Sequence, residues 1–357
     1  MRIAFCIGQL TKGGAERVVC NLANSFSKKD DISIISLRND KLAYKLDKSI
    51  KTIFLDEKKE RKIKKNYLRY KKLKKLLVEE NYDIIICFLP EPSFLVLLLK
   101  KFISSKVIVS VRNDPRIEYK NLLYKILMKN LYIKADGFVF QTPDAQHFFS
   151  NKIQKKSVVI LNSINPDFFI NKNNVTREKL IVSVGRLEPQ KNQKNIILAF
   201  ANISKKFPDY KLVIYGEGSL RKELENLIAE KNMINRIFLP GISNDIRKSI
   251  ERASIFILSS DYEGLPNSLM EAMALGIPCI STDCPCGGPR LLIKSGNNGF
   301  LVPVNNVVAI ENKIKKLLSD RALLEKISKE SSKIAKVLNP VDINNKWYDY
   351  IKGIVKE

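Results

Sequence analysis

Two glutamates stand eight positions apart at a junction between a turn and a helix, in the segment Glu263-Gly-Leu-Pro-Asn-Ser-Leu-Met-Glu271. We expect Asn267 or Ser268 to cap a helix that continues to Leu275 and stops at Gly276. The positive end of such a helix binds anions, and carboxylates accept hydrogen bonds from sugar hydroxyls. The segment therefore suits a sugar that carries a diphosphate, which would lie against Gly264, Leu265, Pro266, Asn267, Ser268 and Leu269. The spacing taken alone favours a simpler interpretation, an acid that caps its own helix plus a surface glutamate.

A second group of charged residues follows the apolar run 180–185, which predicts a buried strand. Arg186-Leu-Glu-Pro-Gln-Lys191 forms the loop after it, and a helix continues through Phe200. The Arg fork and the Lys point charge together can clamp a diphosphate and stabilise it as a leaving group. Two solvated loop cations are the alternative, and such cations are common in a chain with 62 Lys and Arg.

A glycine pair, Gly13-Gly14, lies between a predicted strand over 2–7 and a predicted helix over 15–26. Paired glycines let the backbone approach a ligand closely at a helix N-terminus. The pair is not the G-x-G-x-x-G fingerprint of dinucleotide-binding proteins. Alone it is a weak signal.

Taken together, these segments resemble the retaining family 4 glycosyltransferases of the GT-B fold. The resemblance rests on Gly13-Gly14-Ala-Glu-Arg17, Gly185-Arg186-Leu followed by Lys191-Asn192, and the Glu263 to Glu271 segment, with support from Tyr215-Gly-Glu-Gly218 and Ser295-Gly-Asn-Asn-Gly299. It covers nearly the whole chain and is most specific in the C-terminal half. Within that family the chain is most similar to enzymes that build capsular, O-antigen or exopolysaccharide repeat units.

The resemblance implies an α/β architecture with two doubly wound Rossmann-like domains that face a central cleft. Residues 1–165 would bind the acceptor and residues 175–339 the nucleotide sugar, with a C-terminal helix over about 340–357 crossing back to the first domain. The alternation of strands and helices agrees with parallel sheets covered on both faces. We expect buried strands at 2–7, 32–37, 84–89, 106–111, 137–141, 157–161, 180–185, 211–215, 236–239, 254–258 and 277–281.

The resemblance also implies roles for the site residues. Arg186, Lys191 and Glu263 would be catalytic, Glu271 would bind the ribose, and the Gly14 amide would bind the distal phosphate. The donor would be a nucleoside-diphosphate sugar, UDP-linked by expectation, and transfer would retain the anomeric configuration by front-face attack. We expect no metal and no other cofactor, because the chain contains no Asp-x-Asp. Residues expected near the acceptor or the sugar are Gly13, Arg17, Arg112, Asn113, Gly287 and Gly288.

One departure from the family lies after the strand at 106–111. Many relatives carry a His near the donor sugar, where this chain has Arg112-Asn113. Either side chain can donate a hydrogen bond to a sugar or a phosphate. Neither is a general base near neutral pH, so no role of that His is carried over.

The formal net charge is +25, and residues 1–165 hold 33 Lys and Arg against 16 Asp and Glu. Lys58–Lys75 contains eleven basic residues and one acid, with apolar residues at helical spacing. This pattern indicates either a helix drawn to an anionic membrane surface or a solvated helix packed on the sheet, and both interpretations stay open. A polyprenyl-diphosphate-linked saccharide as acceptor would account for the charge. Nucleic acid is not expected as a partner, because no recognition module is present.

The six cysteines lie mostly in apolar runs, and the N-terminal apolar run is too short for a secretory leader. We therefore expect a cytoplasmic protein that is peripheral on the inner face of the cell membrane. Two other functions remain open from the sequence. One is a sugar-nucleotide epimerase or phosphorolytic enzyme on the same fold, and the other is a non-catalytic protein that binds lipid or polyanions.

Overall fold

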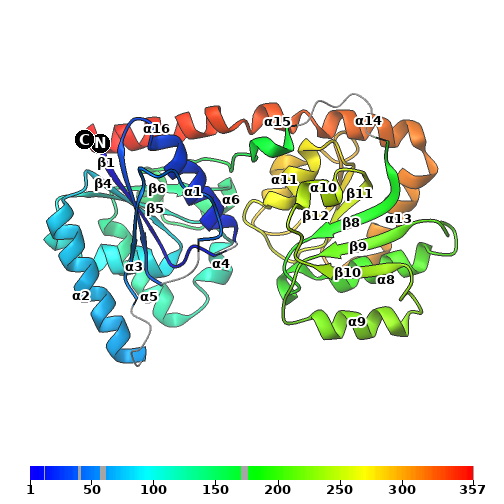
Figure 1. The fold of residues 1–357 in the computed structure, drawn as a ribbon, viewed down its shortest axis with the longest axis horizontal. Coiled ribbons are helices and arrows are strands. Elements are labelled where there is room, and N and C mark those ends of the chain that lie inside the picture. The colour runs from blue at the N-terminus through cyan, green and yellow to red at the C-terminus, as the bar shows by residue number, and fades with distance from the viewer. Residues whose placement is uncertain (12, 39–41, 57–61, 170–175, 357) are drawn as a thin grey trace. The chain divides into compact units, whose positions relative to one another are not determined.

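The computed structural model describes residues 1–11, 13–38, 42–56, 62–169 and 176–356, and the chain divides into two compact units (Figure 1). Unit 1 comprises Met1–Ser163 and Val341–Glu357, and unit 2 comprises Ile164–Pro340. Each unit is built around one parallel sheet with helices on both faces. The predicted pair of doubly wound Rossmann-like domains is confirmed.

The sheet of unit 1 has the order β3-β2-β1-β4-β5-β6-β7, so the winding direction reverses between β1 and β4. Every neighbouring pair in it is parallel. Its strands are β1 (Arg2–Ile7), β2 (Asp31–Ser36), β3 (Lys51–Phe54), β4 (Ile84–Phe88), β5 (Lys106–Ser110), β6 (Gly137–Phe140) and β7 (Ser157–Val159).

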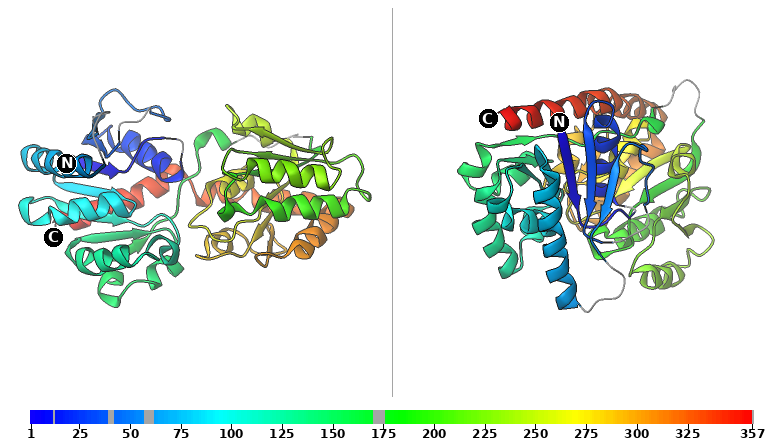
Figure 2. Two further views of the ribbon diagram at one scale, coloured as in Figure 1. Left: turned by 90° about the horizontal axis from the view of Figure 1, so that it is seen from below. Right: turned by 60° about the vertical axis from the view of Figure 1, so that its left-hand side comes forward.

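Helices cover both faces of this sheet, as the two views of Figure 2 also show. They are α1 (Gly14–Phe26), α2 (Lys62–Glu80), α3 (Pro90–Leu98), α4 (Pro115–Glu118), α5 (Leu122–Leu131), α6 (Pro143–His147), α7 (Asn151–Gln154) and α16 (Pro340–Lys356), with short 3-10 turns η1 (Lys100–Phe102) and η2 (Tyr132–Lys134). Helices α1 and α16 share one face, and α2, α3 and α5 cover the other (Figure 1).

The C-terminal helix packs on the sheet of the first domain, as predicted. The Trp347 ring stacks on Phe88 of β4 with centroids 6.0 Å apart, and Tyr348 meets Phe26 of α1 at 5.3 Å. The Tyr350 hydroxyl donates to the Lys156 carbonyl at 2.8 Å and accepts from the Phe138 amide at 3.0 Å. A Cβ at Gly137 would lie 2.6 Å from that hydroxyl, so the close approach requires glycine there.

The sheet of unit 2 has the order β10-β9-β8-β11-β12-β13, with its reversal between β8 and β11. Its strands are β8 (Glu178–Val184), β9 (Lys211–Tyr215), β10 (Ile237–Gly241), β11 (Ala253–Leu258), β12 (Cys279–Thr282) and β13 (Phe300–Val302). Its helices are α8 (Gln193–Ile203), α9 (Arg221–Glu230), α10 (Ile246–Ile250), α11 (Asn267–Ala274), α12 (Gly288–Leu292), α13 (Val307–Ser319), α14 (Arg321–Ser331) and α15 (Ile334–Val337), with 3-10 turns η3 (Pro166–Phe168) and η4 (Pro189–Lys191). Apolar side chains of the strands, α8 and α13 form its buried core.

All eleven predicted strands are present, each within two residues of its expected ends. Two further strands, β3 and β13, were not expected. They are four and three residues long and lie at the outer edges of the two sheets. A strand at an edge is covered less completely than a central one, so its sequence need not carry a long apolar run.

Candidate functional site

The predicted donor residues of unit 2 gather at the carboxyl edge of its sheet, beside the reversal of the strand order. Lys191 lies in the connection that follows β8, and Glu263 in the connection that follows β11. Strands β8 and β11 are hydrogen-bonded neighbours in the sheet. In doubly wound sheets, ligands bind in the crevice at this reversal.

Lys191 and Glu263 form a largely buried ion pair. The Lys191 ammonium donates to Glu263 Oε1, and the two side chains are 16% and 8% exposed. The Ser260 hydroxyl donates to the same oxygen at 2.7 Å. These contacts join two residues that lie 72 positions apart in the chain and fix both charges at one place.

Side chains in the connections that follow β8 and β11 fix the backbone around Lys191. Asn192 has a left-handed backbone (φ 46°, ψ 46°), and its side-chain amide donates to Asp261 Oδ1 at 2.8 Å. The Ser259 hydroxyl donates to the carbonyl oxygens of Lys191 and Asn192, each at 2.8 Å. Ser259 and Ser260 directly follow β11. Their position at the carboxyl end of a central strand is the one feature of the sequence that could have indicated a place in the site.

Arg186 lies on the same edge but is exposed. Its guanidinium donates to Gln190 Oε1 at 3.4 Å, and its carbonyl accepts from Gln193 Nε2 at 2.8 Å. The backbone is therefore fixed at the start of α8, while the cationic end faces solvent. An exposed guanidinium in this place is accessible to an anionic ligand.

The loop before α11 differs in one respect from the sequence prediction. The residue that caps α11 is Pro266 rather than Asn267 or Ser268, and no side chain caps the helix. The prediction was wrong because the loop is held from outside. The Glu263 amide donates to the Pro285 carbonyl at 2.6 Å, and the Cys286 amide donates to the Glu263 carbonyl at 2.7 Å.

Helix α11 begins one residue after Pro266, which has no N–H, so the expected row of amides from Gly264 to Leu269 is interrupted. Ser268 and Leu269 lie in the first turn, where helix geometry leaves N–H groups without an intrahelical acceptor. Glu271 lies one turn inside α11 and is buried, which excludes the alternative of a surface glutamate.

The glycines of this edge bring backbone segments together. A Cβ at Gly288 would lie 1.8 Å from the Gly264 carbonyl oxygen, and one at Gly216 would lie 1.9 Å from the Gly185 carbonyl oxygen. The close approach at Gly288 is therefore to the donor loop itself. Gly287 precedes it with a φ of 79°, a left-handed conformation that favours glycine.

In unit 1, Gly13 caps α1 and Gly14 is its exposed first residue. A Cβ at Gly13 would lie 2.1 Å from a carboxylate oxygen of Glu16, so that glycine makes room for the Glu16 side chain. The Tyr44 hydroxyl donates to the Gly13 carbonyl at 2.9 Å. The Arg17 amide donates to the same carbonyl at 3.2 Å and closes the first turn of the helix.

Arg112 follows β5 and is buried, with its guanidinium 5.5 Å from the centroid of the Phe88 ring. It donates to the Asn162 side-chain oxygen and, at 3.5 Å, to the Ser110 hydroxyl. Burial lowers the pKa of Arg112 to about 9. Asn113 next to it is half-buried. Arg112 is thus engaged within unit 1 and braces the carboxyl edge of its sheet.

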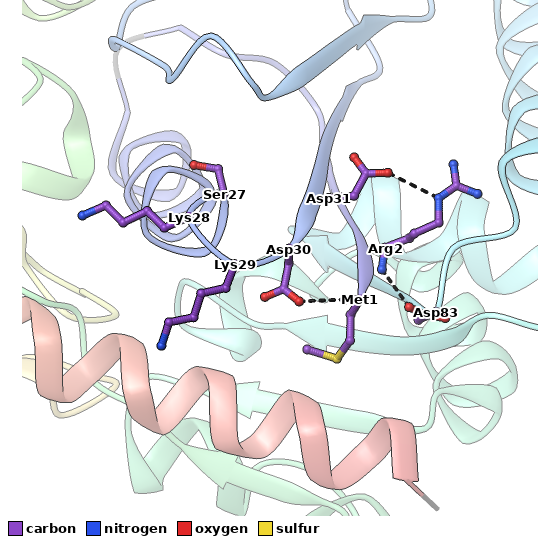
Figure 3. Close-up of a pocket in the computed structure, with 8 residues that line it drawn as sticks. All are labelled: Met1, Arg2, Ser27, Lys28, Lys29, Asp30, Asp31 and Asp83. Carbon is purple, nitrogen blue, oxygen red and sulfur yellow. Dashed lines mark hydrogen bonds and ion pairs between the residues drawn. The ribbon is translucent and has the colours of Figure 1, made fainter.

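A hollow of about 540 Å³ lies at the opposite, amino edge of the unit 1 sheet (Figure 3). Its charges are largely paired with one another: the N-terminal ammonium with Asp30 at 2.8 Å, and the Arg2 guanidinium with Asp31 at 3.4 Å. The Arg2 amide also donates to Asp83 at 2.7 Å. This hollow lies away from the sheet edge at which such folds bind ligands, and we do not include it in the site.

All six cysteines are buried free thiols, and burial raises the pKa of Cys284 to about 12. Within the described residues, no group of three His, Cys, Asp or Glu side chains is placed to hold a metal ion. None of the helices in the described part of the chain is long and apolar enough to cross a membrane. Of the polybasic segment, residues 58–61 lie outside the described residues, and the rest forms the first part of α2.

Two protein-family models match the two halves of the chain. Residues 12–168 match the model described as Glycosyltransferase Family 4, and residues 165–334 match Glycosyl transferases group 1. The meeting point of the two models coincides with the division between the two units.

Two similar proteins come from Campylobacter jejuni and match the chain over nearly its full length. One is N-acetylgalactosamine-N,N'-diacetylbacillosaminyl-diphospho-undecaprenol 4-alpha-N-acetylgalactosaminyltransferase, 29% identical over 99% of this chain and 100% of that protein. The other, an alpha-1,4-N-acetyl-D-galactosaminyltransferase whose acceptor is a diphospho-undecaprenol-linked saccharide, is 26% identical over 99% of both chains. Among solved structures, that of Anabaena HepE in complex with UDP has a TM-score of 0.84 and 17% identity, and covers 99% of this chain and 100% of that one.

Proposed function

Because its two halves match these two models, the chain belongs to the glycosyltransferases of family 4, and we propose that it is a retaining enzyme that moves a hexose or N-acetylhexosamine from a UDP-sugar to a lipid-linked saccharide. The observation that carries this proposal is the buried Lys191–Glu263 pair at the reversal of the unit 2 sheet.

The donor would lie with its diphosphate against Lys191, Arg186 and the first turn of α11. Two cations and the positive end of a helix offset the charge that develops on the departing phosphate. The Glu263 carboxylate would accept hydrogen bonds from the sugar hydroxyls. Glu271, one turn further along α11, is the candidate for the ribose hydroxyls.

Transfer would proceed on one face of the sugar. The acceptor oxygen bonds to the anomeric carbon as the bond from that carbon to the phosphate oxygen breaks, and the acceptor proton passes to the departing phosphate oxygen. This step needs positioning and stabilisation of the leaving group rather than a strong protein base. The contacts of Ser259, Ser260 and Asn192 support it, because they fix Lys191 and Glu263 before the donor arrives.

UDP as the nucleotide is supported by the UDP complex of Anabaena HepE, and the acceptor class by the names of the two Campylobacter relatives. We propose that unit 1 binds a polyprenyl-diphosphate-linked saccharide, with the Gly14 amide and Arg17 facing the reacting groups. No metal or other cofactor takes part in this proposal. The basic surface of unit 1, including the Lys58–Lys75 segment, would hold the enzyme on the anionic inner face of the cell membrane.

The experiment that tests this proposal is a panel of UDP- and GDP-sugars added to the purified protein in EDTA. Thermal stabilisation and slow donor hydrolysis are the readouts, with UDP-N-acetylgalactosamine as the first donor. We expect one donor to raise the Tm by a few degrees through preferential binding to the folded state. Lys191→Ala should abolish the shift, and Lys194→Ala, an exposed lysine of α8, is the matched control.

The anomeric configuration of the product, read by NMR, tests retention separately. An inverted product would contradict the front-face mechanism while leaving the donor assignment intact. If none of the sugar nucleotides stabilises the folded protein, the donor assignment is wrong.

A further inference from the structure

Helix α5 of unit 1 carries an exposed apolar surface that no part of the proposed site uses. Leu122 is 72% exposed, Leu123 59%, Ile126 49%, and Ile133 in the following turn η2 is 52% exposed. Leu122 and Ile126 lie one turn apart on α5, and Ile133 lies in the 3-10 turn that directly follows the helix. We call these four residues the α5 apolar stripe.

The stripe belongs to a well-anchored helix, so its exposure is not a frayed end. The Asn121 side chain caps α5 by accepting from the Leu123 amide at 2.8 Å. On the inward side, Tyr124 meets Phe94 of α3 edge-on at 5.4 Å, and Leu131 is buried. The helix therefore uses one face for packing and presents a second apolar face outward. Large exposed apolar surface of this kind marks an interaction site.

The charged residues of the segment that carries the stripe are all of one sign. No acid occurs between Glu118 and Asp136, and the charged residues of that interval are Lys120, Lys125, Lys129 and Lys134. Lys120, Lys125, Lys129 and Lys134 are all exposed. An apolar stripe bordered by cations is the pattern of a helix that lies in the interface of an anionic bilayer.

The neighbouring helices continue the same pattern on the same face of the sheet (Figure 1). Phe102 in η1 is 41% exposed, with the ammonium groups of Lys74 and Lys101 at 3.6 and 4.9 Å from its ring centroid. The acids on α2 and α3 are paired: Glu79 with Lys75 at 3.8 Å, Glu80 with Arg2 at 2.7 Å, and Glu91 with Arg38 at 2.8 Å. The face formed by α2, α3 and α5 thus combines exposed cations with exposed apolar side chains.

We propose that the α5 apolar stripe inserts into the headgroup region of an anionic lipid bilayer, with its lysines against the lipid phosphates. A bilayer fits better than a protein partner, because binding to an anionic bilayer requires only exposed apolar side chains with cations next to them. The proposal deepens the proposed function, since it names the element that anchors unit 1 where a lipid-linked acceptor lies, but lipid binding can be measured without glycosyl transfer.

The test is flotation of the full-length protein with vesicles of phosphatidylcholine, with and without phosphatidylglycerol. We expect binding to the anionic vesicles, and a loss of at least about tenfold in Leu122→Gln/Ile126→Gln, because removing buried apolar area lowers the partition coefficient. The matched control is Ile234→Gln/Ile242→Gln, two exposed apolar residues of unit 2. This control should bind as the wild type does.

Insertion is tested separately with Leu123→Trp, whose fluorescence should shift to the blue with anionic vesicles and be quenched by brominated acyl chains. Trp347 is buried and gives a constant background. Vesicle binding that Leu122→Gln/Ile126→Gln leaves unchanged would overturn the proposal. So would a dimeric wild type that the same variant converts to monomers without any binding to vesicles, because the stripe would then be a self-interface.

The outcome for the proposed function is read independently, with a short-chain acceptor that is soluble in water. Leu122→Gln/Ile126→Gln should keep its rate with that acceptor and lose rate only with acceptor embedded in vesicles. If no variant transfers sugar to any acceptor while vesicle binding remains, the proposed function is wrong and the docking surface stands.

Discussion

The Glu263 carboxylate accepts from two donors at one oxygen, the Lys191 ammonium and the Ser260 hydroxyl. Lys191→Ala and Glu263→Gln should each lower the rate of transfer by about 100-fold or more, as expected when one stabilising group of a transition state is lost. Each should also lower stability by about 1–3 kcal/mol, because a buried group loses its partner. Rates come from transfer assays and stability from urea unfolding, and the double variant Lys191→Ala/Glu263→Gln measures the coupling between the two side chains. A single variant with a rate near that of the wild type would contradict the site assignment.

In the proposed mechanism Ser260 is a positioning residue, since its hydroxyl contacts Glu263 and would not contact the reacting atoms. Ser260→Ala should lower kcat about tenfold with little change in the KM for the donor, because Glu263 loses one of the two contacts that fix its orientation. Ser254→Ala is the matched control: this buried serine lies at the start of β11, the strand that Ser260 follows, and donates to the Glu178 carbonyl. If both serine variants behaved alike, the effect would be one of strand stability rather than of position.

At the scale of the elements, the contact between α12 and the donor loop depends on Gly288. A methyl group there would lie 1.8 Å from the Gly264 carbonyl, so Gly288→Ala must displace the loop that carries Glu263. We expect a loss of about 2 kcal/mol or more in the free energy of unfolding, together with loss of donor binding. Gly353→Ala in α16, where nothing lies within 4 Å, should instead gain about 0.5–1 kcal/mol through helix propensity. Equal effects of the two substitutions would contradict the close contact.

A carboxyl group at the end of α4 gives unit 1 a specific pH dependence. Burial, followed by the charge of Asp114, raises the pKa of Glu118 to about 8, while Arg112 opposes the shift. The pKa of Glu118 is higher in the folded state than in the unfolded state, so between these two pKa values the folded state binds one more proton. The free energy of unfolding therefore falls as the pH rises between them, by about 1.4 kcal/mol per pH unit at most. Glu118→Gln should remove that loss between about pH 5 and pH 8. A wild type and variant whose Tm values run parallel with pH would contradict the shift.

The sequence predicted the central strands and the charged loops, and missed features set by contacts distant in the chain. An apolar run such as Ile84–Phe88 is enough to predict a buried strand. The sequence of β3 has no such run, and β3 is a strand because it pairs with the edge of the sheet. The predicted cap of α11 was wrong because the loop before this helix is fixed by backbone hydrogen bonds from Glu263 to Pro285 and from Cys286 to Glu263. The contact of Ser260 with Glu263 could not be predicted, because it depends on the fold that brings Lys191 to the same carboxylate. The residue types thus indicate which chemistry is possible, and contacts between residues distant in the chain hold the side chains in place.

For the whole molecule, two units with separate cores should unfold in separate transitions. The single tryptophan, Trp347, is buried against Phe88 in unit 1, so its fluorescence reports the unfolding of that unit alone. The proposed nucleotide site lies in unit 2. UDP should therefore raise the Tm of unit 2, seen by calorimetry, by a few degrees, because the ligand binds the folded state of that unit. The Tm of unit 1, seen by Trp347 fluorescence, should stay nearly unchanged. Lys191→Ala should remove the shift, and Lys194→Ala should keep it. If UDP moved the Trp347 transition alone, the nucleotide would bind unit 1 and the assignment of donor and acceptor to the two units would be reversed.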